Sequence, residues 1–176
     1  TVEKNFFLLQ NPGAQDPSDW ASDFENNKFN GWSCKGITTC GQYGKMCGGV
    51  RKKARNEHIS KTFTGLNVGQ DYTISLDFVR LESWDSENAY VDLIGAQIED
   101  PDIRVKDQSG KYHCWMKEKI THNTGINQCG RGGWKEDLYP VVCTGKAAST
   151  SMTVKIHTSL NQGSSDEAFG MDNYVF

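Results

Sequence analysis

The sequence predicts an all-β fold, an antiparallel β-sandwich of the jelly-roll type with disulfide-held loops. Three observations point to it: apolar and polar residues alternate along several short stretches, glycine is abundant, and the six cysteines form an even set. The 18 Gly with only four Pro suit strands joined by tight turns. No stretch offers a helix of ten residues with 3.6-residue periodicity. A chain of 176 residues is expected to form one domain, residues 1–176.

The most regular alternation lies in residues 72–95. Apolar residues occupy every second position from Tyr72 to Phe78, as in a strand with one buried face. The alternation returns at residues 89–93 after a polar interruption at 82–88. We expect these two stretches to form an antiparallel pair at the centre of the sandwich, with the ring of Trp84 folded back over the sheet edge.

Weaker patterns predict the remaining strands. Trp32 is expected to lead a strand into the core, with Trp20, Phe24 and Phe29 as apolar anchors in the polar stretch before it. Residues 33–58 and 100–145 are the two loop-rich, cysteine-bearing regions, with a strand near Val50 and strands on either side of residues 108–110. Further strands are expected at residues 1–10, 58–63, 134–142, 147–160 and 169–176.

The cysteines favour disulfides and an oxidising compartment, because their number is even and no CxxC pair occurs. Their clustering suggests one bridge within residues 34–47, one within 114–143, and one joining the two groups. A zinc site that uses cysteines with His58, His113 or His122 is the alternative. The candidate disulfide residues are Cys34, Cys40, Cys47, Cys114, Cys129 and Cys143.

Charge and hydropathy exclude two classes of partner. The net charge of −3 gives no basic footprint for nucleic acid, and the basic cluster at residues 51–55 is interpreted as a solvated loop or the guard of an edge strand. No apolar run approaches the ~20 residues of a membrane span. The sequence starts at Thr1 without a leader, so we expect any signal peptide to have been removed. An extracellular or cell-surface location is predicted.

Both ends of the chain resemble a known family. The opening LLQNPGAQ at residues 8–15, with Gly31-Trp32, resembles that of galactose-binding-like jelly rolls and carbohydrate-binding modules, and DEAFGMDNYV at residues 166–175 resembles their closing strand. The stretch SWDSE at residues 83–87, with this closing strand, also resembles cysteine-rich surface proteins of protists. The resemblance covers the ends and the centre, leaves out residues 33–58 and 100–145, and indicates fold more than function.

This resemblance implies a structural calcium ion where the opening turn meets the last strand. Asp172 matches the family's aspartate in the final strand, whereas Gln15 stands where an acid is typical and brings no charge. The alternative is that the Asp172 carboxylate caps turn amides beside Asn173. Ca²⁺ is therefore an expected, structural cofactor.

The sequence offers no set of residues for catalysis. No G-x-S-x-G, H-E-x-x-H or Walker-type motif occurs. Glu82, Asp85 and Glu87 could form a carboxylate pair for glycoside hydrolysis, but their crowding in one bend favours solvated charges or cation ligands. The four histidines are scattered and are expected to be exposed. We therefore predict that the protein is not an enzyme.

Two non-catalytic functions are predicted. The first is an extracellular structural or adhesive module, a subunit of a coat or filament in which copies of the chain join through sheet edges and an N-terminal strand. The second is a carbohydrate-binding, lectin-like module that binds glycans on loop aromatics; the alternative for each aromatic residue is core packing. The assembly candidates are Phe6, Phe7, Leu8 and Leu9, and the carbohydrate-binding candidates are Tyr43, Trp115, Trp134 and Tyr139.

Overall fold

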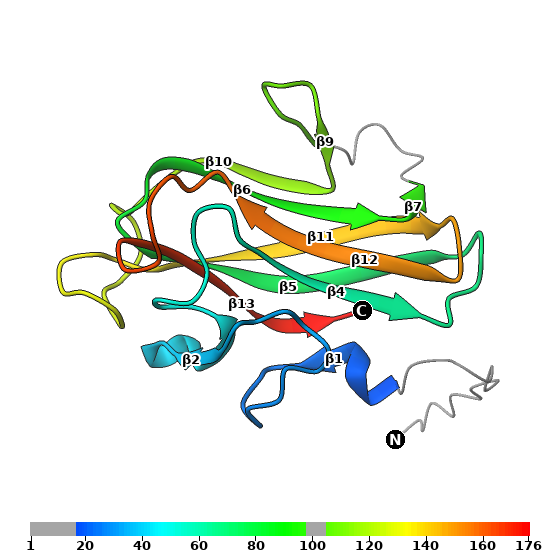
Figure 1. The fold of residues 1–176 in the computed structure, drawn as a ribbon, viewed down its shortest axis with the longest axis horizontal. Helices are drawn as coiled ribbons and strands as arrows, with labels where there is room; N and C mark the ends of the chain where they lie inside the picture. The colour runs from blue at the N-terminus through cyan, green and yellow to red at the C-terminus, as the bar shows by residue number, and fades with distance from the viewer. Residues whose placement is uncertain (1–16, 98–104) are drawn as a thin grey trace, which may run out of the picture.

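The structure, a computed structural model, describes residues 17–97 and 105–176 and contains two antiparallel sheets packed face to face (Figure 1). Its helical elements are two 3-10 turns, η1 (Pro17–Trp20) and η2 (Gly41–Tyr43). In this part of the chain no helix is long and apolar enough to cross a membrane. The predicted all-β antiparallel sandwich is confirmed.

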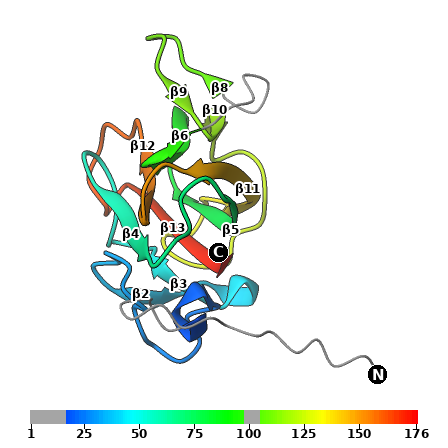
Figure 2. The ribbon, with the colours of Figure 1, turned by 90° about the vertical axis from the view of Figure 1, so that its right-hand side faces the viewer.

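The larger sheet has seven strands and the smaller has four. The larger runs in the order β2-β3-β13-β5-β11-β7, with β1 paired to β13, and the smaller in the order β10-β6-β12-β4. A separate hairpin, β8 (Val105–Lys106) and β9 (Tyr112–His113), lies beside the smaller sheet (Figure 2). The strands of the larger sheet are β1 (Ala21–Ser22), β2 (Ile37–Thr39), β3 (Lys45–Gly48), β5 (Asp71–Glu82), β7 (Ala96–Gln97), β11 (Asp137–Ala147) and β13 (Glu167–Val175). Those of the smaller sheet are β4 (His58–Thr64), β6 (Asp85–Ile94), β10 (Trp115–Thr121) and β12 (Ser151–Thr158).

The strand order is that of a jelly roll. Along the chain β3, β4, β5 and β6 alternate between the sheets, β10 stays beside β6, and β11, β12 and β13 alternate again. The resulting layers, β3-β13-β5-β11 and β4-β12-β6-β10, interleave strands that are distant in sequence, as two Greek keys do. The predicted jelly-roll topology is therefore present.

The predicted pairing of the two central strands is wrong. β5 pairs with β13 and β11, whereas β6 pairs with β10 and β12 in the opposite sheet. The two strands are joined by Ser83 and Trp84, and the Trp84 ring is fully buried rather than lying over an edge. Its Nε1 donates a hydrogen bond of 2.8 Å to the carbonyl of Ala168, and its ring lies perpendicular to that of Phe78. The link is thus a corner between layers, not a hairpin.

The core lies between the two sheets and follows the predicted alternation. The inward faces of β5, β6 and β12 supply most of it, together with Phe24 and Trp32 from the loops before β2. Trp32 lies in no strand, and Phe29 is 47% exposed, so neither the strand predicted at Trp32 nor the anchor predicted at Phe29 is present. A second, smaller cluster lies on the outer face of the larger sheet, where Met46 of β3 joins Val79 and Leu81 of β5.

All six cysteines form disulfides. The bridges are Cys34–Cys47, Cys40–Cys129 and Cys114–Cys143, with Cα–Cα distances of 4.8, 5.0 and 5.7 Å. One bridge lies within each cysteine group and one joins the groups, which is the pattern that clustering along the chain predicts. No cysteine remains free, so the alternative of a cysteine-based zinc site does not hold.

The described edges of the smaller sheet are guarded. The pairing of β10 with β6 shifts register twice near Lys117 and Ile120, and residues 117–119 are exposed and charged. At the other edge, the Ser33 amide donates to the Ser60 carbonyl of β4. Such features hinder edge-to-edge pairing. The assembly residues Phe6, Phe7, Leu8 and Leu9 lie outside the described residues, so assembly through sheet edges and an N-terminal strand stays a prediction.

Candidate functional site

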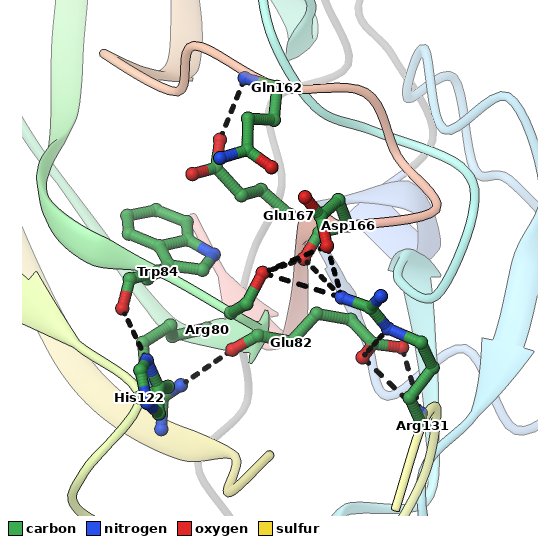
Figure 3. A network of polar contacts seen from close by, with 9 residues as sticks. Arg80, Glu82, Trp84, His122, Arg131, Gln162, Asp166 and Glu167 are labelled. Atoms are coloured by element: carbon green, nitrogen blue, oxygen red, sulfur yellow. Dashed lines mark hydrogen bonds and ion pairs between the residues drawn. The ribbon is translucent and has the colours of Figure 1, made fainter. Parts of the chain in front are cut away.

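Three connections meet at one end of the sandwich (Figure 3). They are the corner between β5 and β6, the 122–136 connection between β10 and β11, and the 159–166 connection between β12 and β13. The Ser83 amide donates to the Asp166 carbonyl over 3.0 Å, and the His122 amide donates to the Trp84 carbonyl over 2.9 Å. Backbone contacts therefore hold the three connections together.

Arg131 is the polar centre of this end. Its amide and Nε donate to the carboxylate of Glu82, a residue at the end of β5 that is only 1% exposed. Its Nη2 donates to the Ser83 hydroxyl and to both the carbonyl and the carboxylate of Asp166 (Figure 3). The hydrogen bonds that Arg131 donates to Asp166 and Glu82 raise its pKa, so the guanidinium stays charged. One side chain thus links all three connections.

The backbone around Arg131 requires a glycine beside it. Gly130 has φ +71°, and a Cβ built there would lie 2.1 Å from Oε1 of Glu82. Glu82 itself has φ +68°, an uncommon angle for a residue with a side chain, and this turns its carboxylate toward the 122–136 connection. The Glu82–Arg131 contact therefore depends on the missing side chain at position 130.

A second arginine, which is buried, lies beneath this network. Arg80 of β5 is 0% exposed and pairs with Asp137 of β11, with 3.1 Å between Nη2 and Oδ2. It also donates to the carbonyls of Glu82 and Thr124. The position continues the inward face of β5 beyond Phe78, and the strand register places Asp137 directly opposite. The charge is thus paired at the rim of the core.

Trp134 lies over this network. Its ring is perpendicular to that of His122, with 4.4 Å between centroids, and the Arg131 guanidinium lies 5.6 Å from the ring centre. It is partly exposed and belongs to neither hydrophobic cluster of the described chain. Its neighbours are therefore polar groups that are themselves held in place.

The other three predicted carbohydrate-binding residues pack on apolar clusters. Trp115 and Tyr139 lie on the main core beside Phe78, with ring centroids 5.9 and 6.4 Å from that ring. Tyr43 packs on the small cluster outside the larger sheet, and its hydroxyl donates to the Glu136 carbonyl. Burial raises the pKa of Tyr43 and Tyr139. The structure does not bring the four candidates into one platform, and Trp134 is the candidate outside both clusters.

Three carboxylates converge below the same end, in a combination that sequence reasoning missed. Asp85, Glu87 and Glu167 each bring one oxygen within 4.8 Å of the others. Burial raises the pKa of Glu87 to about 7, with a further contribution from its hydrogen bond to Asp85, and burial also raises the pKa of Glu167. The sequence placed Asp85 and Glu87 in one bend with Glu82, but Glu82 faces Arg131 instead. Glu167, 80 residues further along, completes the cluster.

These carboxylates do not form a catalytic pair that a substrate can reach. Glu167 is 0% and Glu87 6% exposed, so only Asp85 of the three lies at the surface. A general acid or base must come within hydrogen-bond distance of the proton it transfers. The raised pKa values of Glu87 and Glu167 therefore reflect burial rather than a reaction.

A second polar cluster lies on the outer face of the smaller sheet. Asp92 of β6 accepts hydrogen bonds from His113 of the hairpin and His157 of β12, at 2.6 and 2.9 Å. His113 is only 2% exposed and also contacts Asp107, so the prediction that the histidines are exposed is wrong for this residue. The three side chains Asp92, His113 and His157 are close enough to hold a metal ion. Asp92 already contacts both histidines and lies 3.5 Å from the Lys111 amine, so its carboxylate is satisfied as it stands.

The predicted calcium residues are only partly described. Asp172 in β13 is 4% exposed, and its Oδ1 accepts a 2.7 Å hydrogen bond from the amide of Asn173, which lies in the same strand rather than in a turn. Burial raises the pKa of Asp172 to about 7, and Asp77 adds to the shift. Gln15 lies outside the described residues. A calcium ion at this place stays a prediction.

Comparison with known proteins indicates a distant likeness of fold. No protein-family model and no curated protein matches the chain. Among solved structures, the K3 cleaved adhesin domain of Lys-gingipain from Porphyromonas gingivalis is 12% identical, with a TM-score of 0.40 over 79% of this chain and 69% of that one. The K1 domain of the same protein is 13% identical, with a TM-score of 0.41 over 74% and 72%. The C-terminal domain of EclA, a sugar-binding protein, is 15% identical, with a TM-score of 0.41 over 87% and 94%.

Proposed function

We propose that this chain is a non-catalytic, extracellular adhesive module that binds glycans at the end of the sandwich where Trp134 lies. Three disulfides support a location outside the reducing cytosol. The buried state of Glu87 and Glu167 supports a role without catalysis. The Cys40–Cys129 disulfide holds the 122–136 connection in place, so binding at this end requires no conformational change.

The observation that carries this proposal is the position of Trp134. An aromatic ring beside polar hydrogen-bonding groups offers a stacking surface for the apolar face of a sugar. The ring of Trp134 lies next to His122 and Arg131, and Arg131 is fixed by Glu82 and Asp166. The platform is thus preorganised, which lowers the entropic cost of binding.

The charges around this ring favour neutral sugars. The single positive charge of Arg131 is matched by the two carboxylates of Glu82 and Asp166. Within this network the carboxylates outnumber the guanidinium, which disfavours an acidic glycan, while the Asp166 carboxylate and the His122 ring can bond to sugar hydroxyls. Neutral oligosaccharides are the proposed ligand class.

The test is binding to an array of neutral and acidic oligosaccharides by the oxidised wild-type protein and by Trp134→Ala. Wild type should bind a set of neutral glycans, and Trp134→Ala should lose at least about tenfold in affinity, equivalent to about 1.4 kcal/mol. Phe29→Ala is the matched control, because Phe29 is an exposed aromatic residue on another loop. This variant should bind like wild type. Absence of glycan binding by wild type, or undiminished binding by Trp134→Ala, would refute the proposal.

A further inference from the structure

The cluster of Asp85, Glu87 and Glu167 lacks a positive partner. No lysine, arginine or histidine of the described chain forms an ion pair with any of the three, whereas Glu82 pairs with Arg131 and Asp137 with Arg80. Two of the three carboxylates are almost completely buried. Buried carboxylates are normally paired with cations or bound to metal ions. The cluster therefore needs either protons or a bound cation to neutralise it.

One oxygen of the cluster also lacks a hydrogen bond. Oε2 of Glu167 accepts bonds from the amides of Asn161 and Gln162, at 3.1 and 2.9 Å. Oε1 of the same carboxylate is buried and accepts none from the described residues. Since Glu167 is 0% exposed, this oxygen has lost its bulk water without gaining a protein donor. It is the oxygen left available to a ligand.

The two oxygens of Glu87 are oriented by neutral donors. The Asp85 amide donates to Oε2 over 2.7 Å, and the Asn161 side-chain amide donates to Oε1 over 3.2 Å. These bonds fix the carboxylate but leave its charge uncompensated. The side chain is therefore positioned by one set of contacts and still available to a cation.

We propose that Asp85, Glu87 and Glu167 bind one Ca²⁺ ion. The site consists of carboxylate oxygens, which are the ligands that Ca²⁺ prefers, and it lacks the nitrogen or thiolate ligands typical of zinc. Two oxygens on opposite sides of a Ca²⁺ ion are about 4.8 Å apart, since each Ca–O bond is about 2.4 Å. The three oxygens all lie within this limit, so the arrangement needs no large movement to accept the ion.

An ion at this position joins the two sheets. Asp85 and Glu87 lie at the start of β6 in the smaller sheet, and Glu167 begins β13 in the larger. Asp166, the residue before Glu167, holds Arg131 below Trp134. Calcium would therefore stabilise the end of the sandwich that carries the candidate glycan platform. The calcium site consists of the three carboxylates and does not depend on glycan binding.

The experiment is titration of the oxidised, chelator-treated protein with CaCl₂, followed by calorimetry and by thermal unfolding. We expect binding of one ion and, at about 10 mM calcium, a rise in Tm of about 3 to 10 °C, given the affinities of about 10⁻⁴ to 10⁻³ M typical of extracellular modules. Both signals should be lost in Glu167→Gln and in Glu87→Gln. The second variant keeps the test decisive if the first does not fold.

Glu136→Gln is the matched control. Glu136 is also 0% exposed, its Oε2 also accepts two backbone amide bonds, and its Oε1 also lacks a partner among the described residues. Its only cluster partners are Cys40 and Cys129, which are disulfide-bonded, so Glu136→Gln should keep calcium binding. Absence of calcium binding by wild type would overturn the proposal. Loss of binding in Asp172→Asn with retention in Glu167→Gln would place the ion elsewhere and would overturn it equally.

Discussion

Asp92 and His113 are joined by a 2.6 Å hydrogen bond between Oδ1 and Nδ1, and this contact holds the β8–β9 hairpin against the outer face of the smaller sheet. The hairpin has only two residues in each strand, and directly after it Cys114 is bonded to Cys143 and donates its amide to the Val91 carbonyl. The His113 ring also lies 4.4 Å from that of Tyr90. The His113 side chain is thus one of the contacts that hold the hairpin on the sheet.

Replacing His113 with Ala should detach this hairpin. The change removes the hydrogen bonds to Asp92 and Asp107 and leaves the first carboxylate without its closest partner, so the free energy of unfolding should fall by about 2 kcal/mol. Lys111→Ala is the control, because its exposed amine lies 3.5 Å from Asp92 and should contribute less than about 0.5 kcal/mol. Urea denaturation measures both. Equal effects of the two variants would contradict the prediction.

Asp92 should make the free energy of unfolding depend on pH in the acidic range. Burial disfavours its charged form, but the hydrogen bonds from His157 and His113 outweigh burial and hold its pKa at about 2, below the ordinary 3.8. The unfolded chain therefore binds more protons between these values, and the stabilisation present above about pH 4 is lost as the pH falls toward 2. The difference in unfolding free energy between wild type and Asp92→Asn should shrink by about 2 kcal/mol over this range. If the difference in unfolding free energy between wild type and Asp92→Asn did not change with pH, the prediction would be refuted.

Arg80→Met should destabilise the protein strongly. The change leaves the Asp137 carboxylate and the carbonyls of Glu82 and Thr124 without their buried donor, at a cost of about 3 to 5 kcal/mol. Lys146→Ala removes the exposed ion pair with Asp71 and should cost less than about 1 kcal/mol. Chemical denaturation of both variants measures the two losses of unfolding free energy. Unfolding of Arg80→Met at the wild-type midpoint would contradict the prediction.

Gly130→Ala should disturb the contact between Glu82 and Arg131. The added methyl group would meet the Glu82 carboxylate, and φ +71° disfavours alanine, so a loss of about 1 to 3 kcal/mol is expected. Gly132→Ala, two residues away, has no atom within 4 Å of the new Cβ and should change stability by less than about 0.5 kcal/mol. Thermal unfolding of the pair measures the difference. Similar melting of the two variants would show that the close approach at Gly130 is not required.

The disulfide between Cys40 and Cys129 should contribute more than that between Cys34 and Cys47. It closes a sequence separation of 89 residues against 13, and a longer loop restricts the unfolded chain more. Replacing each pair with alanine should cost about 4 to 5 and about 3 kcal/mol, respectively. Denaturation of the two double variants under oxidising conditions tests the order, and the reverse order would contradict it.

Period-two patterns predicted most of the long strands. The alternation of residues 72–78, 89–93 and 152–157 corresponds to β5, β6 and β12, because strands buried on one face repeat every two residues. The pairing of β5 with β6 could not be read in the same way. A two-residue link suits a hairpin or a corner between layers, and the choice depends on whether the Trp84 ring enters the core.

A charged residue at an inward-facing strand position shows that it is buried, but its partners are hard to predict from the sequence. Lys61 stands between Ile59 and Phe63 on the inward face of β4, where alternation places an apolar residue. Its amine donates to the Asp19 carbonyl and to the Tyr174 hydroxyl, and burial lowers its pKa to about 8. Those partners lie 42 and 113 residues away in sequence, so the position indicates burial but not what satisfies the charge.

The candidate sites depended on neighbours that only the fold supplies. Period two places Asp92 and His157 on the outward faces of their strands, but nothing local indicates that β6 and β12 are adjacent. Glu167 opens β13 two residues before the strand predicted at residues 169–176, and its meeting with Asp85 and Glu87 follows from the corner at Trp84. Trp134 was among four aromatic candidates, and only packing separated it from the three on the hydrophobic clusters.

The bridge between Cys114 and Cys143 should keep the protein in one piece after proteolytic cleavage between these cysteines. Lys135 lies exposed in the connection between these two cysteines, where trypsin-like enzymes can cut. Such a cut leaves Cys114 and Cys143 on different fragments, and the bridge keeps the two fragments in one molecule. On a non-reducing gel the nicked protein should migrate as a single band, and only a reductant should separate its two pieces.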